Sequence, residues 1–412
     1  MPDAHPYQTL VPDLILDAVE SCGYRCDGRQ YPLNSFENRV YQVWCEDDKV
    51  LVAKFYRPER WSDETILEEH AYSRELTARE IPVVAPIADA AGKTLHKLGG
   101  FRFALFPRQG GRAPELDDPD TLRWIGRFMG RIHAVGGLKP FAHRPRIDVE
   151  SFGEAPAEFV LEHGFVPPDL ADAYEAIVHD ALERVDSCYA RAGAVGNIRL
   201  HGDCHAGNIL WSEQGPHFVD LDDCRSGPAV QDLWMLLSGD AAAMGVQLSH
   251  VLGGYREFCD FNPAELNLVE ALRTLRMIHY AGWLATRWDD PAFPVNFPWF
   301  NTQRYWQDQI LALRVPRHPL TLAAFGARGI LPATVAGRAF STDEARGLLA
   351  GAAAHSFLPL SRPFTTSMGL MLLTSAHVAG WPSAQGGSQA IADAMGARLT
   401  ELGGTIETGR MV

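Results

Sequence analysis

The sequence lacks several features that would assign it at once to a common class of protein. Its 412 residues include seven cysteines, an odd number with no C-x-x-C pair, which argues against a disulfide framework and for reduced thiols. No stretch reaches the roughly 18 apolar residues of a membrane helix. The first residues lack the apolar core of a signal peptide. We therefore predict a cytoplasmic protein that has no membrane partner.

Positive charge is also scarce. The chain has 37 basic and 51 acidic residues and a net charge of −14, whereas a general nucleic-acid binder would present a basic face. We therefore predict no nucleic-acid partner. Lysine is especially rare, with five lysines against 32 arginines, so a lysine inside a strand pattern is informative.

The composition changes near residue 316. Residues 317–412 hold seven arginines, no lysine and five acidic residues, and they are rich in Ala, Gly, Ser and Thr. The preceding part carries the remaining 30 basic and 46 acidic residues. This shift predicts a boundary between two segments of different origin.

The order of the secondary-structure patterns predicts an α+β fold with two lobes. The segments RVYQVWCE and VLVAKFYR predict two strands joined by a turn, and 101–107 predicts a third. Ser62, followed by acidic residues, marks the start of a helix. Further helical patterns follow at 119–136, 170–192, 229–239, 245–259, 264–288 and 301–314, with a loop predicted for DPAFPVNFPWF. We predict a small β-rich lobe at 1–107 and a larger helical lobe at 108–316.

The segment HGDCHAGNIL, residues 201–210, concentrates reactive side chains and admits four interpretations. A zinc site would use His201, Cys204 and His205, but zinc sites usually draw on two separated clusters and no second one is present. Cys204 as a nucleophile would need a base, and a histidine adjacent in sequence rarely has that geometry. A polar loop without chemistry is the third interpretation.

The fourth interpretation is a loop for phosphoryl transfer. Asp203 would orient the accepting hydroxyl group and take its proton. Asn208, five residues later, and Asp220, at the end of the next strand, would bind Mg²⁺, which prefers hard oxygen ligands and phosphates. The order Asp, Asn, then metal-binding Asp parallels the catalytic apparatus of kinases.

A kinase also needs a lysine and a glutamate upstream of this loop. The segment LVAKFYR supplies Lys54 within a strand, and the following helix offers Glu68 or Glu69 as its partner. We favour Glu69, because Ile66 and Leu76 then lie on nearby faces of the helix. A solvated strand lysine and ordinary exposed glutamates are the alternatives.

The loop that would cover the phosphates departs from the kinase pattern. Residues 32–40 lie just before the first strand, where kinases carry a glycine-rich loop, yet they contain no glycine. Ser35 and its neighbouring amides can still approach a phosphate, as polar turn residues do.

Together these parts resemble the bacterial kinases of the aminoglycoside-phosphotransferase-like, protein-kinase-like superfamily, and within it a group of serine/threonine protein kinases. H-G-D-x-x-x-x-N is the catalytic loop of that superfamily. The strings that carry the resemblance run in order across about residues 8–310: PLNSFENRVYQV, KFYRPERW, ILEEH, LHGDCHAGNILW, FVDLDD, GPAVQDLWMLL and DPAFPVNFPW.

The resemblance implies a role for each matching residue in the catalytic loop and the covering loop. Asp203 would be the proton acceptor. Asn208 and Asp220 would hold Mg²⁺, and Asp220 would belong to the catalytic set as well. Ser35 would contact ATP, and Lys54 would anchor its phosphates.

Three further residues receive supporting roles from the same resemblance. Glu69 would hold the lysine. Phe106, with Pro107, would form the hinge between the lobes where adenine docks; without the resemblance it is only the end of a strand. Asp232 would support the catalytic loop, although an acid at a helix N-terminus is also favoured by the helix dipole alone.

The tail resembles a different family. The string GWPSAQGGSQAIADAM is similar to an internal piece of a phytoene-desaturase-like flavin oxidoreductase. The G-x-G-x-x-G loop is absent, and a fragment without it has no pyrophosphate site. We interpret 317–412 as an incomplete α/β-type, oxidoreductase-like fragment left by a gene fusion or a chimeric sequence.

These observations lead us to predict an ATP- and Mg²⁺-dependent kinase that works as a monomer on the Ser or Thr hydroxyl of a protein, its own included. One alternative is a small-molecule kinase for an amino alcohol or an aminoglycoside. Another is a non-catalytic binding protein with a kinase fold. A flavin oxidoreductase is disfavoured by the missing dinucleotide loop.

Overall fold

The computed structural model of the chain describes residues 6–239 and 241–314. All of them belong to the first, Met1–Ala323, of the two units into which the chain divides. The segment 317–412, for which the sequence predicts an oxidoreductase-like fragment, lies outside the described residues. Across the described ranges, no helix combines the length and apolar character needed to cross a membrane.

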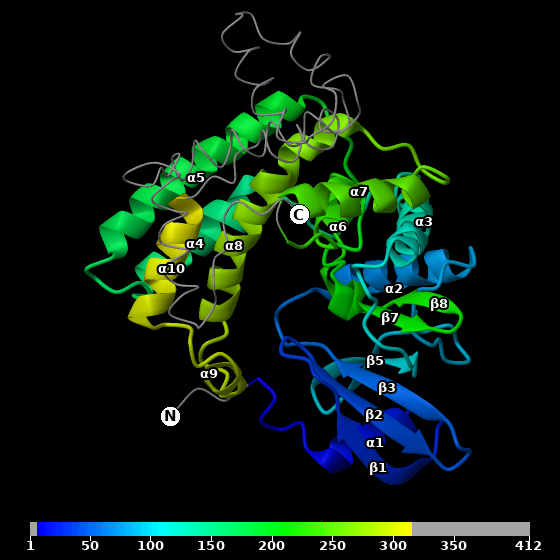
Figure 1. The fold of residues 1–412 in the computed structure, drawn as a ribbon. Helices are drawn as coiled ribbons and strands as arrows, with labels where there is room; N and C mark the ends of the chain where they lie inside the picture. Colours follow the sequence, from blue (N-terminus) through cyan, green and yellow to red (C-terminus); the bar gives the residue numbers. More distant parts are fainter. Residues whose placement is uncertain (1–5, 240, 315–412) are drawn as a thin grey trace, which may run out of the picture. The chain divides into compact units, whose positions relative to one another are not determined.

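The small lobe is built on a five-stranded antiparallel sheet with the spatial order β1-β2-β3-β5-β4 (Figure 1). Helix α1 (Pro12–Glu20) precedes the sheet, and α2 (Asp63–Thr77) connects β3 to β4. Ser62 caps α2 as predicted, because its side chain accepts a hydrogen bond from the Thr65 amide. The strands are β1 (Cys26–Pro32), β2 (Arg39–Cys45), β3 (Val50–Phe55), β4 (His96–Leu98) and β5 (Phe101–Pro107).

Successive side chains of β3 and β5 point to opposite faces of the sheet. One face is apolar, and the other faces the candidate site. Leu51, Ala53 and Phe55 pack with the side chains of α1 in one core cluster. The intervening residues of β3 point to the opposite side of the sheet, toward α2. Lys54 therefore emerges on that second face, paired across the sheet with Ala104.

The large lobe is helical, as the sequence predicts (Figure 1). Its helices surround two core clusters, one built around α3 and α7 and the other around α5, α8 and α10. Short helical turns occur at Glu150–Glu154, Ala206–Asn208, Leu221–Asp223 and Pro263–Leu268. The helices are α3 (Pro119–Gly136), α4 (Ala155–Glu162), α5 (Ala171–Ala192), α6 (Val230–Trp234), α7 (Ala241–Tyr255), α8 (Val269–Ala285), α9 (Ala292–Asn296) and α10 (Gln303–Arg314).

Two short sheets place the catalytic-loop segment between the lobes. Strand β6 (Ile198–Arg199) pairs with β9 (Ser226–Gly227). Strands β7 (Ile209–Ser212) and β8 (Gly215–Phe218) form the predicted hairpin, with Ile209 opposite Phe218. The hairpin brings the segment before β7 beside the segment after β8.

Two local predictions differ from the structure, and the first is that the helix expected at 229–239 covers only Val230–Trp234. The proline-rich segment DPAFPVNFPWF contains helix α9 where a loop was expected. Asp290 explains the helix, because its carboxylate accepts the Ala292 amide and so satisfies a donor at the helix start. Proline is tolerated in the first turn of a helix, where its missing N–H would have no partner anyway.

Candidate active site

Two cavities meet between the lobes. The sheet-side cavity, of about 320 Å³, is lined by Lys54 and Phe106 among others. The α8-side cavity, of about 450 Å³, is lined by Asp203 and by residues of α8. Asn208 and Asp220 line both. The residues expected to bind a metal therefore lie where the two spaces join.

Lys54 is held by three carboxylates. Its Nζ lies 2.9 Å from Asp220 Oδ1, 3.2 Å from Asp222 Oδ1 and 3.8 Å from Glu69 Oε1. Burial acts to lower the pKa of Lys54, but the surrounding carboxylates raise it well above its ordinary value. The side chain is therefore a fixed positive charge on the wall of the sheet-side cavity.

The two candidate glutamates of α2 have different surroundings. Glu69 is buried and joins Lys54 to Arg144, whose Nη2 lies 3.0 Å from Glu69 Oε2. Glu68 points elsewhere and accepts three hydrogen bonds from the backbone amides of 142–144, at 2.6 to 2.8 Å. Of the two, Glu69 is the one placed to hold the lysine, while Glu68 anchors a loop of the large lobe.

The buried carboxylate of Asp232 fixes the backbone at the start of the catalytic loop. Asp232 of α6 accepts hydrogen bonds from the amides of His201 and Gly202, both at 2.8 Å, and its Oδ2 lies 3.0 Å from His133 Nε2. Gly202 has a φ of 87°, and a Cβ there would lie 2.1 Å from the carbonyl oxygen of Asp223. The second position of H-G-D therefore requires glycine.

Asp203 follows this glycine and faces the α8-side cavity. Its Oδ1 lies 2.8 Å from Arg276 Nη2, and its Oδ2 lies 3.5 Å from His205 Nε2. Burial acts to raise the pKa of Asp203, but the contact with His205 and the charge of Arg276 outweigh it and lower the pKa. The carboxylate is therefore ionised at neutral pH and able to accept a proton.

Asn208 and Asp220 bring an amide oxygen and a carboxylate to the same end of the hairpin. The amide of Val219 donates to the carbonyl of Asn208 across the hairpin end, which brings the next residue, Asp220, close by. Asp220 has a φ of 59°, and its side chain is 52% exposed. The Asn208 Nδ2 donates to the carbonyl of Asp203, which leaves its Oδ1 as the atom available to a cation.

The protein supplies only part of such a metal shell. No group of three or more His, Cys, Asp or Glu residues with metal-site geometry occurs in the part of the chain that the structure describes. Mg²⁺ typically takes one or two protein carboxylates and completes its octahedron with waters and phosphates. One carboxylate and one amide oxygen at the mouth of a cavity fit that pattern.

Cys204 does not have the environment of a nucleophile. Its thiol is fully buried, and burial raises its pKa well above the ordinary value, so the thiolate is disfavoured. The neighbouring His201 is also buried, and its Nε2 lies 2.9 Å from the carbonyl of Val219. Both side chains serve the packing of the loop.

Comparison with known proteins agrees with this geometry. The sequence model of the phosphotransferase enzyme family matches residues 30–268. The chain belongs to this family. Stress response kinase A of Escherichia coli strain K12 is 47% identical over 306 residues, which cover 74% of this chain and 92% of that protein. Serine/threonine protein kinase RdoA of Salmonella typhimurium strain LT2 is 46% identical over 307 residues, with the same coverage. The protein is therefore an enzyme, a kinase.

Solved structures support the fold of this phosphotransferase. Amicoumacin kinase hAmiN, in complex with AMP-PNP, Ca²⁺ and Ami, has a TM-score of 0.56 at 19% identity and covers 71% of this chain and 92% of its own. A microcompartment-associated aminopropanol kinase has a TM-score of 0.54 at 17% identity and covers 72% of this chain and 98% of its own.

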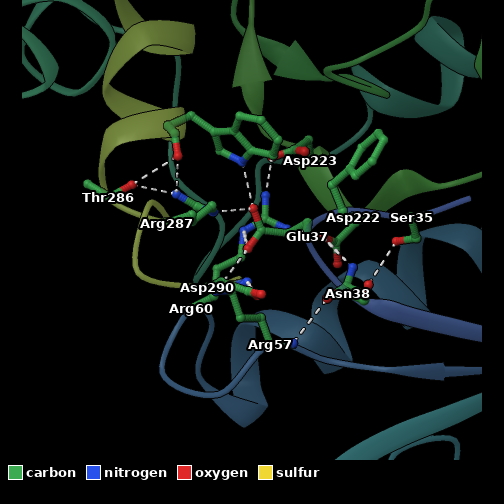
Figure 2. A network of polar contacts seen from close by, with 12 residues as sticks. Ser35, Glu37, Asn38, Arg57, Arg60, Asp222, Asp223, Thr286, Arg287 and Asp290 are labelled. Carbon is green, nitrogen blue, oxygen red and sulfur yellow. Dashed lines mark hydrogen bonds and ion pairs between the residues drawn. The ribbon is translucent and has the colours of Figure 1, made fainter. Parts of the chain in front are cut away.

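In this phosphotransferase, the glycine-free covering loop is tied to the large lobe by Glu37 (Figure 2). The Glu37 Oε2 accepts hydrogen bonds from Trp283 Nε1 and Arg287 Nε, both at 2.6 Å. Its Oε1 lies 3.8 Å from Arg57 Nε and 3.7 Å from Arg60 Nε. We call Glu37, Trp283 and Arg287 the loop clamp. Ser35 precedes the clamp, lines both cavities and donates to the carbonyl of Asn38 at 3.1 Å.

A second contact between the lobes lies close to the clamp. The carboxylate of Asp290, which is buried, accepts hydrogen bonds from Arg39 and Arg57 at 3.1 to 3.2 Å. Arg39 begins β2 and Arg57 follows β3, so the strand after the covering loop and the end of the next strand are both held to the segment after α8.

Sequence reasoning missed two acids that follow Asp220. Asp222 contacts Lys54 and Arg60, and Asp223 lies 2.7 Å from Arg60 Nη2 and 2.9 Å from Arg225 Nη2. Burial acts to raise the pKa of Asp222, but Lys54 and Arg60 lower it to about 2. The signal was present in the sequence as the acid-rich end of FVDLDD.

Proposed function

We propose that this kinase is an ATP- and Mg²⁺-dependent serine/threonine protein kinase. The observation that carries the proposal is the convergence of Lys54, Asn208, Asp220 and Asp203 at the junction of the two cavities. A nucleotide in the sheet-side cavity would direct its phosphates toward this junction, and an acceptor would reach it from the α8 side. Phe106 lines the sheet-side cavity next to Pro107, where adenine would dock.

The reaction is an in-line transfer. The hydroxyl oxygen of the acceptor forms a bond to the γ-phosphorus, and the bond from that phosphorus to the β–γ bridging oxygen breaks, which releases ADP. Asp203 orients the hydroxyl and takes its proton. Lys54 positions the phosphates, with Glu69 holding its ammonium group on the cavity wall.

The metal would be held by Asn208 and Asp220. Bound there, Mg²⁺ supplies positive charge to the phosphate oxygens as the leaving group departs. Asp220 Oδ1 lies 2.9 Å from Lys54 Nζ. With nucleotide and metal bound, Lys54 would instead contact phosphate and Asp220 would contact the metal.

The proposal that the acceptor is a protein is based on the names of the relatives. The Salmonella relative is named a serine/threonine protein kinase, and the chain covers 92% of that protein at 46% identity. This supports a Ser or Thr hydroxyl of a protein, including one on the enzyme itself. We propose that the enzyme is cytoplasmic and monomeric, that the lobes span 1–107 and 108–316, and that 317–412 takes no part in catalysis.

A small-molecule kinase is the second candidate. The observation that favours it is the α8-side cavity of about 450 Å³, whose wall includes the aromatic rings of Phe36, Tyr280, Trp283 and Phe297. A cavity of that size accommodates a small alcohol.

One experiment separates the two candidates. The full chain is incubated with γ-labelled ATP and Mg²⁺, alone, with a protein or peptide acceptor, and with an amino alcohol. Label on polypeptide supports the first candidate, and label only on the amino alcohol supports the second. Asp203→Asn should lower the rate about 10²–10⁴-fold while nucleotide binding is kept, because Asp203 faces the acceptor. Near-normal turnover in this variant would exclude Asp203 as the base.

A further inference from the structure

Arg276 of α8 occupies an unusual position beside the base. Its Nη2 lies 2.8 Å from Asp203 Oδ1, and its side chain is 38% exposed. It lines the α8-side cavity and is absent from the lining of the sheet-side cavity. The guanidinium group therefore stands on the acceptor side of Asp203.

The other carboxylates on the wall of this cavity have basic partners inside the protein, with Asp220 and Asp222 both in contact with Lys54. Glu37 is held by Arg287, and Asp223 by Arg60 and Arg225. Arg225 is buried on Asp223 and is not available to a ligand. Among the described residues that line this cavity, the arginines are Arg225 and Arg276. Arg225 pairs with Asp223, whereas Arg276 pairs with Asp203, the proposed base.

An acceptor hydroxyl directed at the carboxylate of Asp203 would share that group with Arg276, which contacts its Oδ1. The shared negative charge weakens the hold of Asp203 on the guanidinium group. A guanidinium group that gives up a carboxylate in a partly desolvated cavity needs another anion. An acceptor that brings its own carboxylate supplies it.

The surroundings of Arg276 extend the positive charge away from the base. Arg276 and Tyr280 also line a neighbouring cavity, together with Arg273 one helical turn away. Glu270 lines the same cavity, and Arg273 Nη1 contacts Met277 Sδ at 3.0 Å. A polypeptide leaving the α8-side cavity in this direction would meet two arginines in succession.

We propose that Arg276 determines acceptor specificity by binding a carboxylate next to the phosphorylated hydroxyl, so that the enzyme selects Ser or Thr residues flanked by Asp or Glu. This inference rests on the proposed protein kinase activity. The guanidinium group of Arg276 lies 2.8 Å from the carboxylate of Asp203, and an extended chain advances about 3.3 Å per residue. The selected acid is therefore one or two residues from the acceptor.

The test uses the full-length enzyme with MgATP and a set of serine peptides. The peptides differ only at the two positions on each side of the serine, one of which at a time is Asp, Ala or Lys. The wild type should prefer the Asp peptides over the Ala peptides by about 10- to 100-fold in kcat/KM, mainly through KM, the range for one charge-assisted hydrogen bond. Arg276→Gln should abolish the preference, Arg276→Lys should restore part of it, and Arg276→Glu should favour the Lys peptides.

Matched controls make each outcome decisive. Arg304→Gln removes an arginine that is 90% exposed on α10 and should leave the preference unchanged. Equal rates for Asp, Ala and Lys peptides would overturn the inference and leave the protein kinase proposal standing. An equal loss of kcat on every peptide in Arg276→Gln would also overturn it, because Arg276 would then act on the transferred phosphate. Label on an added amino alcohol and on no peptide would overturn both.

Discussion

The loop clamp permits a quantitative prediction about Glu37. Its side chain is only 12% exposed and accepts two hydrogen bonds of 2.6 Å, one of them from the charged Arg287. Glu37→Gln keeps the size of the side chain but removes the charge that faces Arg287, Arg57 and Arg60. Hydrogen bonds to charged groups contribute about 1.5–3 kcal/mol each, and unpaired buried charges add to the cost. We expect the free energy of unfolding of the Met1–Ala323 unit to fall by about 2–4 kcal/mol.

Nucleotide binding should respond as well, since the clamp holds the loop that we expect to cover the phosphates. We expect Glu37→Gln to weaken MgATP binding about 10-fold, which corresponds to about 1.4 kcal/mol. Urea unfolding followed by tryptophan fluorescence measures the first effect, because Trp283 belongs to the clamp, and calorimetric titration with MgATP measures the second. The control is Arg287→Gln, alone and combined with Glu37→Gln. A change in unfolding free energy below about 0.5 kcal/mol, with additive effects in the double variant, would refute a clamp.

Three further predictions concern the metal, a buried histidine and the tail. Asp220→Ala should weaken MgATP binding more than Asn208→Ala, because only the aspartate carries charge; titrations in which both variants match the wild type would place the metal elsewhere. His70 lies between Tyr56 and Thr94, and burial, with a smaller contribution from Lys54, lowers its pKa from 6.5 to about 3. Below pH 6.5 the unfolded chain therefore binds a proton at His70 that the folded chain does not, so the free energy of unfolding is highest above that pH and falls by about 2 kcal/mol by pH 5. In thermal unfolding, His70→Gln should lack this part of the dependence of stability on pH. An unchanged pH dependence would assign it to other groups. A chain ended at residue 316 should keep its transfer activity, because every candidate catalytic residue precedes that position; loss of activity with an intact circular dichroism spectrum would give the tail a role.

The parts of the site that the sequence predicts are those set by local geometry. Asp203, Asn208 and Asp220 sit on one loop and one hairpin, so their spacing along the chain nearly determines their spacing in the fold. Lys54 was recognisable because lysine is rare in this chain and because alternation in a strand decides which face it occupies. The sequence could distinguish Glu69 from Glu68 only by the face of the helix on which each residue lies.

The parts that escaped prediction depend on pairings between distant segments. The contacts of Glu37 with Trp283 and Arg287 join residues 246 and 250 positions apart. Arg276 is one of 32 arginines and carries no local signature of its contact with Asp203. Strand β1 escaped for a different reason, since it is an edge strand whose residues are mostly exposed and therefore show no apolar alternation.

Helix α8 has a consequence for how the two substrates affect each other. Arg276 and Trp283 are seven residues apart and so lie on the same side of one rigid helix. The first contacts Asp203, the proposed base, and the second holds Glu37 in the loop expected to cover the nucleotide. A shift of the helix that favours one ligand changes the affinity for the other. Thermodynamic linkage then requires reciprocity: if bound acceptor tightens nucleotide binding by some factor, bound nucleotide tightens acceptor binding by the same factor.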